Sequence, residues 1–455
     1  MKDRNQFINN PKEKLIIALD FNSMNEATKL IDELGEEAIF YKVGLELFLY
    51  TKGEIIEYLA SKNKKVFLDL KFHDIPNTTA MASLFAAKQN IFMFNVHTSG
   101  GKRMMEKTVE EIKKINKNNL IIGVTVLTSL SENDIKNMFS SNLALKDLAV
   151  NWAKLGKEAG LDGVVCSPKE ANIIKKECGE NFITVCPGVR PKWADINDQE
   201  RTMTPKKAIE NGCDYIVVGR PITRSDNRVK ACKMIIEEIA EGIENNKNLK
   251  SVLIAEALLE TNAVQLNIKN PFIFVSGIKS PIYCDNRLTL TAPDVRNNIE
   301  NSLAEIIRTD YPEAEVLMGT STAGIAHAAI TGHILGLPMG YVRSSAKDHG
   351  RGNQIEGKLE AGQKVVVVED LISTGGSAIE VVEALRGIVS IFTYGMQKSI
   401  DRLADAKVKN ISLTDFDTVV HVAAEKNIIK PGDIARLIAF RNNPSDISWI
   451  NGGNN

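Results

Sequence analysis

The chain has 455 residues, of which 44% are hydrophobic and 25% are charged, and its formal net charge is -1. This composition excludes disordered and fibrous proteins, and the length favours two domains of roughly 200 residues each. The near-zero charge provides no field that would attract nucleic acid or an acidic membrane surface, so anionic ligands must be held by local groups.

The six cysteines show no metal-type spacing, such as two cysteines three positions apart. Residues 1–10 are polar and lack the apolar stretch of a secretory signal. No later apolar run approaches the roughly 20 residues that span a bilayer. We therefore expect a reduced, cytoplasmic protein without a membrane segment.

Short apolar runs rich in β-branched residues alternate with longer helix-like stretches through the first half of the chain. Eight runs are candidate strands: 15–19, 39–43, 66–70, 91–96, 121–127, 163–166, 182–186 and 215–218. Runs of this kind are typical of parallel strands buried on both faces, and eight of them separated by helices predict a (β/α)8 barrel. A doubly wound open sheet is the alternative.

Polar residues at the carboxyl ends of these runs favour the barrel, because barrel enzymes place their chemistry there. These residues are Asp20, Lys42, Asp69, Lys71, Thr128 and Arg220.

The segment 241–248 is strongly polar and predicts a helix end followed by a short linker. We therefore place a domain boundary near 240–250, between a first domain of residues 1–240 and a second of residues 250–455. After a helix that begins at Ser251, strands at 315–318, 338–342, 364–368 and 388–393 alternate with helices. This order predicts a smaller α/β domain.

Asp69 and Lys71 are two positions apart in the third predicted strand, so both side chains point to the same side. Buried charges coexist only when they are paired, and Lys42 and Asp74 supply two further alternating charges. The four side chains are expected to form a nearly neutral network. A purely structural ion-pair cluster is the alternative interpretation.

The segment from Asp69 to Thr78, with Lys42 upstream, resembles the signature of the orotidine 5'-phosphate decarboxylases, over residues 12 to about 228. The resemblance implies that Lys42, Asp69 and Lys71 form the active-site chain. It also implies a homodimer in which Asp74 serves the neighbouring subunit's site. Loss of carbon dioxide from the pyrimidine leaves a carbanion, which an ammonium such as Lys71 can stabilise and then protonate without a metal or cofactor.

The remaining strand ends of the predicted barrel fit the other parts of such a substrate. Asp20 is placed to bind ribose hydroxyls, and in the family Thr128 and Ser129 lie near the pyrimidine. A phosphate clamp is expected from Arg190, Gln199, Gly219 and Arg220. We expect His73 and His97 to serve in packing or hydrogen bonding rather than in catalysis.

In the second half, residues 365–377 combine a buried strand, two carboxylates and a glycine-rich turn that opens a helix. They resemble the phosphoribosyl-pyrophosphate motif of type I phosphoribosyltransferases. Glu369 and Asp370 are expected to bind ribose hydroxyls. The turn is expected to cradle phosphate through its backbone N–H groups and hydroxyls, and comprises Ser373, Thr374, Gly375, Gly376 and Ser377.

Three further segments extend this resemblance. Residues 319–324 form a small-residue loop suited to pyrophosphate, and 276–287, which includes Lys279, is similar to the N-terminal segment of the orotate phosphoribosyltransferases. Residues 343–350 resemble that family's mobile catalytic loop. The resemblance implies that Arg343 contacts phosphate, and that Lys347 and His349 act in a neighbouring subunit's site. A solvated basic loop is the alternative.

One residue departs from the pattern of the orotate phosphoribosyltransferases. Many relatives carry lysine directly after the arginine, where this chain has Ser344, which puts the affinity for pyrophosphate in doubt. Mg²⁺ is implied for this half, because the charge of the phosphoribosyl donor usually needs a divalent ion.

Together the two halves resemble the bifunctional uridylate (UMP) synthases, which join orotidine 5'-phosphate decarboxylase to orotate phosphoribosyltransferase. The expected reactions convert orotate and phosphoribosyl pyrophosphate to orotidine 5'-phosphate, and then to UMP. We expect a homodimer or higher homo-oligomer through both domains, with small-molecule substrates and no nucleic acid.

Two alternatives remain for the function. Sugar-phosphate decarboxylases share the Asp-x-Lys-x-x-Asp pattern, and other transferases act on purines, but residues 76–78 and 276–287 argue against these substrates. A regulatory protein that senses pyrimidines or binds RNA is disfavoured by the retained Lys71, Lys347 and His349 and by the absence of a basic surplus.

Overall fold

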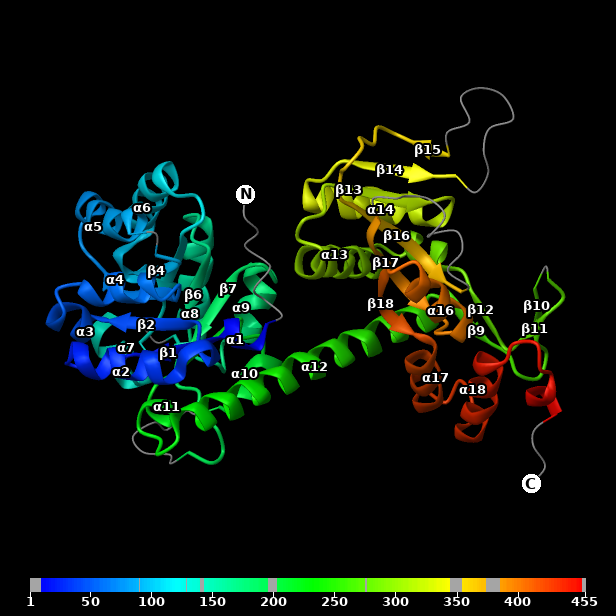
Figure 1. Cartoon of the computed structure of the whole chain (residues 1–455), viewed down its shortest axis with the longest axis horizontal. Coiled ribbons are helices and arrows are strands. Elements are labelled where there is room, and N and C mark those ends of the chain that lie inside the picture. Colours follow the sequence, from blue (N-terminus) through cyan, green and yellow to red (C-terminus); the bar gives the residue numbers. More distant parts are fainter. Residues whose placement is uncertain are drawn as a thin grey trace. The chain divides into compact units, whose positions relative to one another are not determined.

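The computed structural model describes residues 10–89, 91–127, 129–139, 143–194, 203–274, 276–343, 354–373 and 385–451. The chain forms two compact units, Met1–Asn246 and Lys247–Asn455 (Figure 1). Within the described ranges, no helix combines the length and the apolar character needed to cross a membrane.

The first unit is a closed barrel of eight parallel strands that pair in chain order, which confirms the predicted barrel and excludes the open sheet. The strands are β1 (Leu15–Ala18), β2 (Phe40–Gly44), β3 (Lys65–Phe72), β4 (Met93–His97), β5 (Leu120–Val124), β6 (Gly163–Val165), β7 (Ile183–Cys186) and β8 (Tyr215–Val218).

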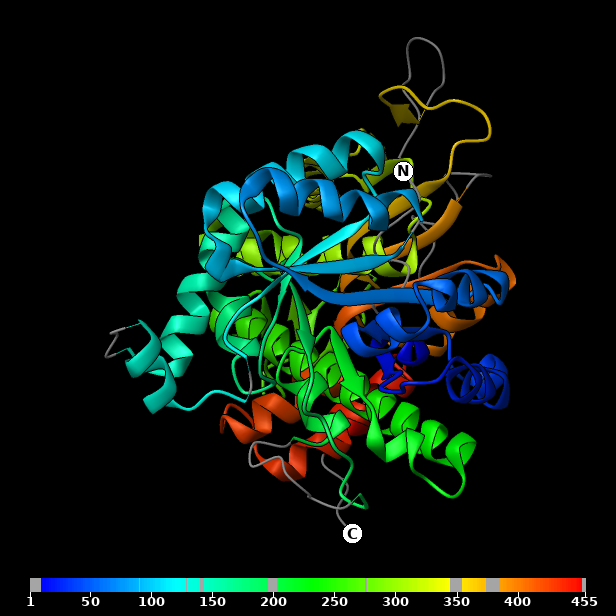
Figure 2. The same ribbon diagram turned by 90° about the vertical axis from the view of Figure 1, so that its left-hand side faces the viewer.

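Helices lie around these strands (Figure 2). They are α1 (Pro11–Lys14), α2 (Met24–Leu34), α3 (Leu45–Tyr50), α4 (Glu54–Ser61), α5 (Pro76–Lys88), α6 (Lys102–Ile115), α7 (Glu132–Phe139), α8 (Leu145–Glu158), α9 (Ala171–Cys178), α10 (Pro205–Glu210), α11 (Arg220–Thr223) and the first part of α12 (Arg228–Glu260).

Helix α2 illustrates how the local sequence sets this outer layer. The Ser23 side chain caps its first turn by accepting a hydrogen bond from the Glu26 N–H. Its buried residues are Ala27, Leu30, Ile31 and Leu34. This 3- and 4-residue spacing gives one apolar stripe, so the helix packs with that stripe against the strands.

Alternating residues of the strands point into the barrel and form an apolar cluster that includes Phe40, Phe67 and Met93. The residues between them pack outward against the helices. Because successive strand residues alternate between the two sides, the positions two beyond these apolar residues also face inward. In β2 and β3 those positions hold Lys42 and Asp69, so the barrel interior changes from apolar to charged toward the carboxyl ends of the strands.

The linker predicted at 241–248 is wrong, because α12 continues through it from Arg228 to Glu260. The polar residues of this segment are anchored on the barrel: Asn245 donates to Glu210 and Asn246 to the Ile209 carbonyl. Ile243 is buried in the barrel's outer core. A Cβ on Gly242 would lie 2.7 Å from the Lys206 carbonyl oxygen, so glycine is required by close packing rather than by a turn.

The second unit is built on a six-stranded sheet in the order β15-β14-β13-β16-β17-β18. Its strands are β13 (Val316–Thr320), β14 (Met339–Val342), β15 (Ile355–Glu356), β16 (Val365–Ile372), β17 (Leu385–Thr393) and β18 (Lys409–Asp415). Its helices are the rest of α12, α13 (Pro293–Asp310), α14 (Ala323–Leu335), α16 (Gln397–Asp405), α17 (Phe416–Glu425) and α18 (Ile434–Asn442). Two short antiparallel pairs precede the sheet, namely β9 (Val264–Leu266) with β12 (Ile282–Cys284) and β10 (Phe272–Ile273) with β11 (Lys279–Ser280).

The central strand β16 is buried on both faces of this sheet. Val366 and Val368 belong to one apolar cluster, and Val365 and Val367 belong to the cluster on the other face. This confirms the predicted α/β unit. The edge strand β18 was not predicted, because its Lys-Asn-Ile-Ser-Leu-Thr-Asp sequence is too polar to stand out as an apolar run.

Candidate active sites

Four charged side chains meet at the carboxyl ends of β1 to β3. Lys71 Nζ lies 2.7 Å from Asp69 Oδ1, and Lys42 Nζ lies 3.3 Å from Asp69 Oδ2. Lys42 Nζ also lies 3.1 Å from Asp20 Oδ1. Two carboxylates and two ammonium groups therefore alternate in one chain, so the cluster is neutral as a whole.

The pairing keeps both central members of the network charged. Burial raises the pKa of Asp69, but Lys42 and Lys71 outweigh this effect and leave the pKa below its usual value. Burial likewise lowers the pKa of Lys42, and Asp69 and Asp20 more than compensate, so that pKa is raised. Asp69 is therefore a fixed carboxylate, and Lys42 a fixed ammonium group, at neutral pH.

Asp69 and Lys71 meet through a bulge rather than along a regular strand. The β3–β4 ladder pairs Leu68 with Phe94 and next pairs Phe72 with Val96, so three residues of β3 lie opposite one residue of β4. Lys71 itself has φ +53, in the left-handed region that a side chain rarely adopts. The predicted meeting of the two side chains is observed, but the regular alternation used to predict it is wrong at this point.

Asn95 is the residue of β4 opposite the bulge, and it was not predicted as a site residue. Its Nδ2 donates to Asp69 Oδ1 at 2.7 Å, and its Oδ1 accepts from the Lys71 backbone N–H at 2.8 Å. The side chain is fully buried. An asparagine inside an apolar run has no characteristic spacing, so only the strand pairing identifies it.

Asp74 does not join the network of its own chain, contrary to our expectation of a four-residue cluster with Lys42, Asp69 and Lys71. Its Oδ1 accepts from the Ile75 N–H at 2.6 Å, and Asp74 is exposed. Asp20 provides the fourth charge instead.

The two nearby histidines pack against each other, as expected. The rings of His73 and His97 lie with centroids 5.2 Å apart. Burial, with smaller effects from His73 and Lys71, lowers the pKa of His97. A neutral His97 therefore borders the network without adding to its charge.

The predicted phosphate clamp lies partly within the described residues. Arg190 is buried, and its backbone N–H donates to the Met203 backbone carbonyl at 2.9 Å. Gly219 and Arg220 open α11, and a Cβ on Gly219 would lie 3.4 Å from Asp20 Oδ2. The end of β8 therefore lies beside Asp20, the ribose-binding candidate that follows β1. Ser129 is exposed after β5.

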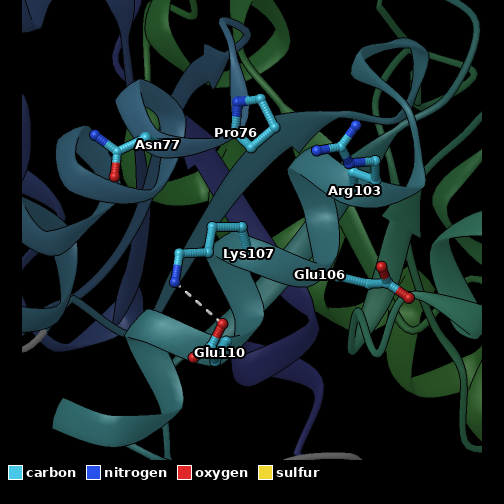
Figure 3. Close-up of a pocket in the computed structure, with 6 residues that line it drawn as sticks. All are labelled: Pro76, Asn77, Arg103, Glu106, Lys107 and Glu110. Carbon is cyan, nitrogen blue, oxygen red and sulfur yellow. Dashed lines mark hydrogen bonds and ion pairs between the residues drawn. The ribbon is translucent and has the colours of Figure 1, made fainter.

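A separate cavity of about 370 Å³ lies between the start of α5 and one side of α6 (Figure 3). It is lined by Pro76, Asn77, Arg103, Glu106, Lys107 and Glu110. None of these residues was predicted as a site residue. Its two basic and two acidic side chains balance, and Lys107 pairs with Glu110 at 3.2 Å. The cavity therefore lacks the surplus of positive charge that a phosphate site needs.

In the second unit, the two predicted carboxylates lie within β16 rather than after it. Glu369 is 7% exposed and accepts a hydrogen bond from Thr320 Oγ1 at 2.6 Å. Burial and the adjacent Asp370 carboxylate raise the pKa of Glu369 to about 8, against a lowering effect of the Thr320 hydroxyl. In the described part of the chain, no salt bridge to either carboxylate is found. No positively charged side chain there balances the charge of this pair.

The predicted small-residue loop at 319–324 begins inside β13, and its glycine at 324 permits close packing. A Cβ on Gly324 would lie 2.5 Å from the Val368 carbonyl oxygen and 2.6 Å from Thr320 Oγ1. Any side chain there would displace the Thr320 hydroxyl from Glu369. The Asn286 side chain donates to the Asp370 backbone carbonyl at 2.6 Å. This bond holds the segment 276–287 against β16.

The basic residues predicted for the second site are only partly described. Arg343 follows β14 and lies 3.5 Å from Glu356. Lys279 is exposed on β11, and Ser373 follows β16. Eight of the predicted residues lie outside the described residues, namely Thr128, Gln199, Lys347, His349, Thr374, Gly375, Gly376 and Ser377.

The donor set of the second site fits an ion that is carried by a ligand. Among the described residues no cluster of three or more His, Cys, Asp or Glu side chains could enclose a metal. Glu369 and Asp370 offer oxygen ligands, which Mg²⁺ prefers, but too few to bind the ion alone. The residues present therefore suit Mg²⁺ that is held mainly by the phosphates of the donor.

Comparison with known proteins agrees with this division of the chain. Residues 13–235 match the orotidine 5'-phosphate decarboxylase / HUMPS family, and residues 289–391 match the phosphoribosyl transferase domain. The orotate phosphoribosyltransferase of Bacillus cytotoxicus is 56% identical over 204 residues, which cover 43% of this chain and 97% of that protein. The enzyme of the same name from Bacillus mycoides is 55% identical over the same shares of both chains.

A solved structure places the same two folds in one chain. The structure of Leishmania donovani UMP synthase matches with a TM-score of 0.58 and 20% identity, over 95% of this chain and 98% of that one. At this identity the likeness concerns the fold. With the two family matches, the chain belongs to the orotidine 5'-phosphate decarboxylase family in its barrel and to the orotate phosphoribosyltransferases in its second half, the combination found in bifunctional uridylate synthases.

Proposed function

We propose that this chain makes UMP in two consecutive reactions. The second unit transfers phosphoribose from phosphoribosyl pyrophosphate to orotate, and the barrel decarboxylates the resulting orotidine 5'-phosphate. The observation that carries the proposal is the neutral Asp20–Lys42–Asp69–Lys71 network, present in one chain with a transferase that would produce its substrate.

In the barrel, the network supplies what decarboxylation without a cofactor requires. As the C6–carboxylate bond breaks, negative charge develops at C6, and the Lys71 ammonium stabilises it and then donates a proton to that carbon. Asp69 holds Lys71 in place through an ion pair of 2.7 Å. Lys42 links Asp69 to Asp20, which is positioned to bind ribose hydroxyls. The phosphate would be bound by Arg190, Gln199, Gly219 and Arg220.

In the second unit, binding and charge neutralisation are the main tasks. Glu369 and Asp370 bind the ribose hydroxyls of the donor, and the turn at 373–377 binds its 5'-phosphate. Mg²⁺ bound to the donor would neutralise the pyrophosphate as it leaves. Arg343, Lys347 and His349 are assigned to the same leaving group, and Lys279 to the substrate.

The barrel's site is completed by a second copy of the chain. Asp74 is exposed and accepts from the Ile75 N–H instead of pairing with a lysine of its own network, as expected for a residue that serves a neighbouring subunit. Large apolar side chains are exposed directly after it at Ile75 (68% exposed), on α5 at Met81 (43%) and on α3 at Leu49 (63%). The cavity between α5 and α6 shares helix α5 with Met81 (Figure 3). An apolar surface of this kind is typical of a protein interface.

We also place the protein in the cytoplasm. All six of its cysteines are free thiols, and five of them are buried. This state is typical of a reducing compartment.

The two reactions are tested with the purified full-length chain. Incubation with orotate, phosphoribosyl pyrophosphate and Mg²⁺ should consume orotate and yield UMP, and added orotidine 5'-phosphate should be decarboxylated. Formation of UMP from neither substrate would reject the proposal. Purine bases and a sugar-phosphate β-keto acid serve as alternative substrates, and faster turnover of either would assign the site to another member of its family.

The shared site is tested by mixing two inactive variants. Lys71→Ala and Asp74→Asn should each lack decarboxylase activity, because each lacks one part of every site. After dissociation and reassociation, an equal mixture should regain roughly a quarter of the wild-type activity, since half of the dimers are hybrids with one intact site. Absence of any recovery would show that Asp74 acts within its own chain.

A further inference from the structure

Asn95 is a buried residue of β4 beside the proposed decarboxylase site, and the role inferred for it rests on that proposed function. Its side chain contacts Asp69 and Lys71, which carry the proposed decarboxylation. It lies 2.7 Å from Asp69 through Nδ2 and 2.8 Å from the Lys71 backbone through Oδ1.

The position of Asn95 follows from the pairing of β3 with β4. Phe94 and Val96 pair with Leu68 and Phe72, so Asn95 alone spans the three bulged residues of β3. A bulge removes backbone groups from the ladder, and a buried N–H without an acceptor is costly. The side-chain carbonyl oxygen of Asn95, Oδ1, accepts from the Lys71 N–H in place of the missing backbone partner.

The bulge also has a conformational cost, because Lys71 adopts φ +53. A non-glycine residue in the left-handed region is strained, and this conformation persists only when surrounding contacts enforce it. The contact with Asn95 is one such contact. It fixes the backbone from which the Lys71 ammonium reaches Asp69.

The orientation of the Asn95 amide is determined by its two partners. The Lys71 N–H needs an acceptor and the Asp69 carboxylate needs a donor, so only one of the two flipped arrangements satisfies both. Asp69 Oδ1 then receives two donors, Asn95 Nδ2 and Lys71 Nζ, each at 2.7 Å. One buried amide thus sets the direction of the carboxylate and the backbone of the lysine together.

We propose that Asn95 is a positioning residue of the decarboxylase, which holds Asp69 and the bulged Lys71 backbone in the arrangement that aims the Lys71 ammonium at the reacting carbon. It touches neither substrate nor the reacting atom. Its effect therefore falls on the rate of the chemical step and not on substrate binding.

The test compares Asn95→Ala and Asn95→Asp with the wild-type full-length chain. Asn95→Asp preserves the shape and the acceptor for the Lys71 N–H but places a carboxylate against Asp69. Misplacement of a reacting group by about 1 Å costs on the order of 10²-fold in rate, so kcat for orotidine 5'-phosphate should fall about 10²-fold in each variant. KM should change less than about 3-fold, because binding groups are intact.

Asn119→Ala is the matched control. Asn119 is a second buried asparagine of the same barrel, and it donates to the Ile91 carbonyl away from the network. Its loss should lower the unfolding temperature and leave kcat within about 3-fold of wild type. Transferase activity of the same chains reports on the folding of the second unit. Wild-type kcat in both Asn95 variants, or an equal loss of kcat in Asn119→Ala, would overturn the proposal.

A crystal structure of Asn95→Ala provides a readout that needs no substrate. We expect the Lys71 backbone to leave the left-handed region and Lys71 Nζ to move away from Asp69. Unchanged geometry at both residues would reject the positioning role, even if the wild-type chain proved to act on another substrate. Inactivity of the wild-type chain toward orotidine 5'-phosphate would instead reject the proposed function.

Discussion

The two sites of this chain treat buried carboxylates in opposite ways. In the barrel, Asp69 lies between two lysines, and its pKa is below the usual value. In the second unit, Glu369 lies beside another carboxylate, and its pKa is raised to about 8. The first site is therefore complete in charge before any ligand binds, whereas the second acquires its positive charge with the ligand.

This difference follows from the two reactions. Decarboxylation creates negative charge on carbon, and a fixed ammonium must already be in place when that charge appears. In the proposed phosphoribosyl transfer the donor is highly charged and would carry a divalent ion, so the carboxylates proposed to bind its hydroxyls would gain their counter-charge from that ion. Changes in the barrel should therefore alter the chemical step most, and changes in the second site should alter binding.

Loss of the barrel's ammonium should have the largest effect. Lys71→Ala should lower decarboxylation by at least about 10³-fold, because it removes both charge stabilisation and the proton donor. The chain should then convert orotate only as far as orotidine 5'-phosphate, as measured by chromatography of the products. Lys65→Ala is a control on the same strand, where Lys65 pairs with Glu13. Production of UMP by Lys71→Ala at the wild-type rate would refute the assigned role.

Removal of one carboxylate from the pair Glu369 and Asp370 should affect the phosphoribosyl transfer alone. Asp370→Asn should lower the transferase's kcat/KM for phosphoribosyl pyrophosphate on the order of 10²-fold, mainly through KM, since a charged hydrogen bond to ribose is lost. Initial rates at varied donor concentration measure this. Decarboxylation of added orotidine 5'-phosphate should be unchanged, and a parallel loss of both activities would indicate a folding defect instead.

A smaller effect is expected from the hydroxyl that orients Glu369. Thr320→Val removes the 2.6 Å hydrogen bond to Glu369 while keeping the shape, and should raise KM for the donor roughly 10-fold. Thr331→Val is the matched control, because Thr331 makes a similar 2.8 Å bond to the buried Glu300 outside the site. Equal KM values in Thr320→Val and Thr331→Val would remove Thr320 from the binding machinery.

The pH dependence of stability should also separate the two units. The folded-state pKa of Glu369, about 8, exceeds its usual value of 4.5, so the folded chain keeps a proton that the unfolded chain releases between these values. The stability of the second unit should therefore fall as pH rises through this window, by at most about 1.4 kcal/mol per pH unit, and level off above it.

Asp69 behaves in the opposite sense, because its folded pKa is depressed. Its contribution is complete above the usual value of 3.8 and is lost only as pH falls through the lower folded pKa. It should therefore add no slope between pH 5 and 8. Calorimetric scans of wild type and Glu369→Gln over that range measure the difference, and identical slopes in both proteins would contradict the raised pKa of Glu369.

The sequence predicted the barrel well because its strands are continuous apolar runs. The same signal located Lys42, Asp69 and Lys71, whose side chains meet in the structure, although their catalytic roles stay predictions. Asn95 and the bulge at Lys71 could not be predicted, because both depend on the pairing of two strands. No local pattern marks a buried asparagine or a shifted register.

Tertiary contacts also explain the errors elsewhere in the chain. The segment 241–248 has the composition of a linker, but packing of Ile243 and the bonds of Asn245 and Asn246 to the barrel keep it helical. Strand β18 is polar because it lies at the edge of its sheet. In both cases neighbouring elements override the local preference.

We propose that one chain holds two independent sites, of which only the second needs a metal ion. The most direct measurement follows UMP formation spectrophotometrically, with and without a chelator, from orotate plus phosphoribosyl pyrophosphate and from orotidine 5'-phosphate alone. We predict that the chelator abolishes UMP formation from orotate and leaves the decarboxylation of orotidine 5'-phosphate unchanged. Loss of both reactions, or of neither, would contradict the account.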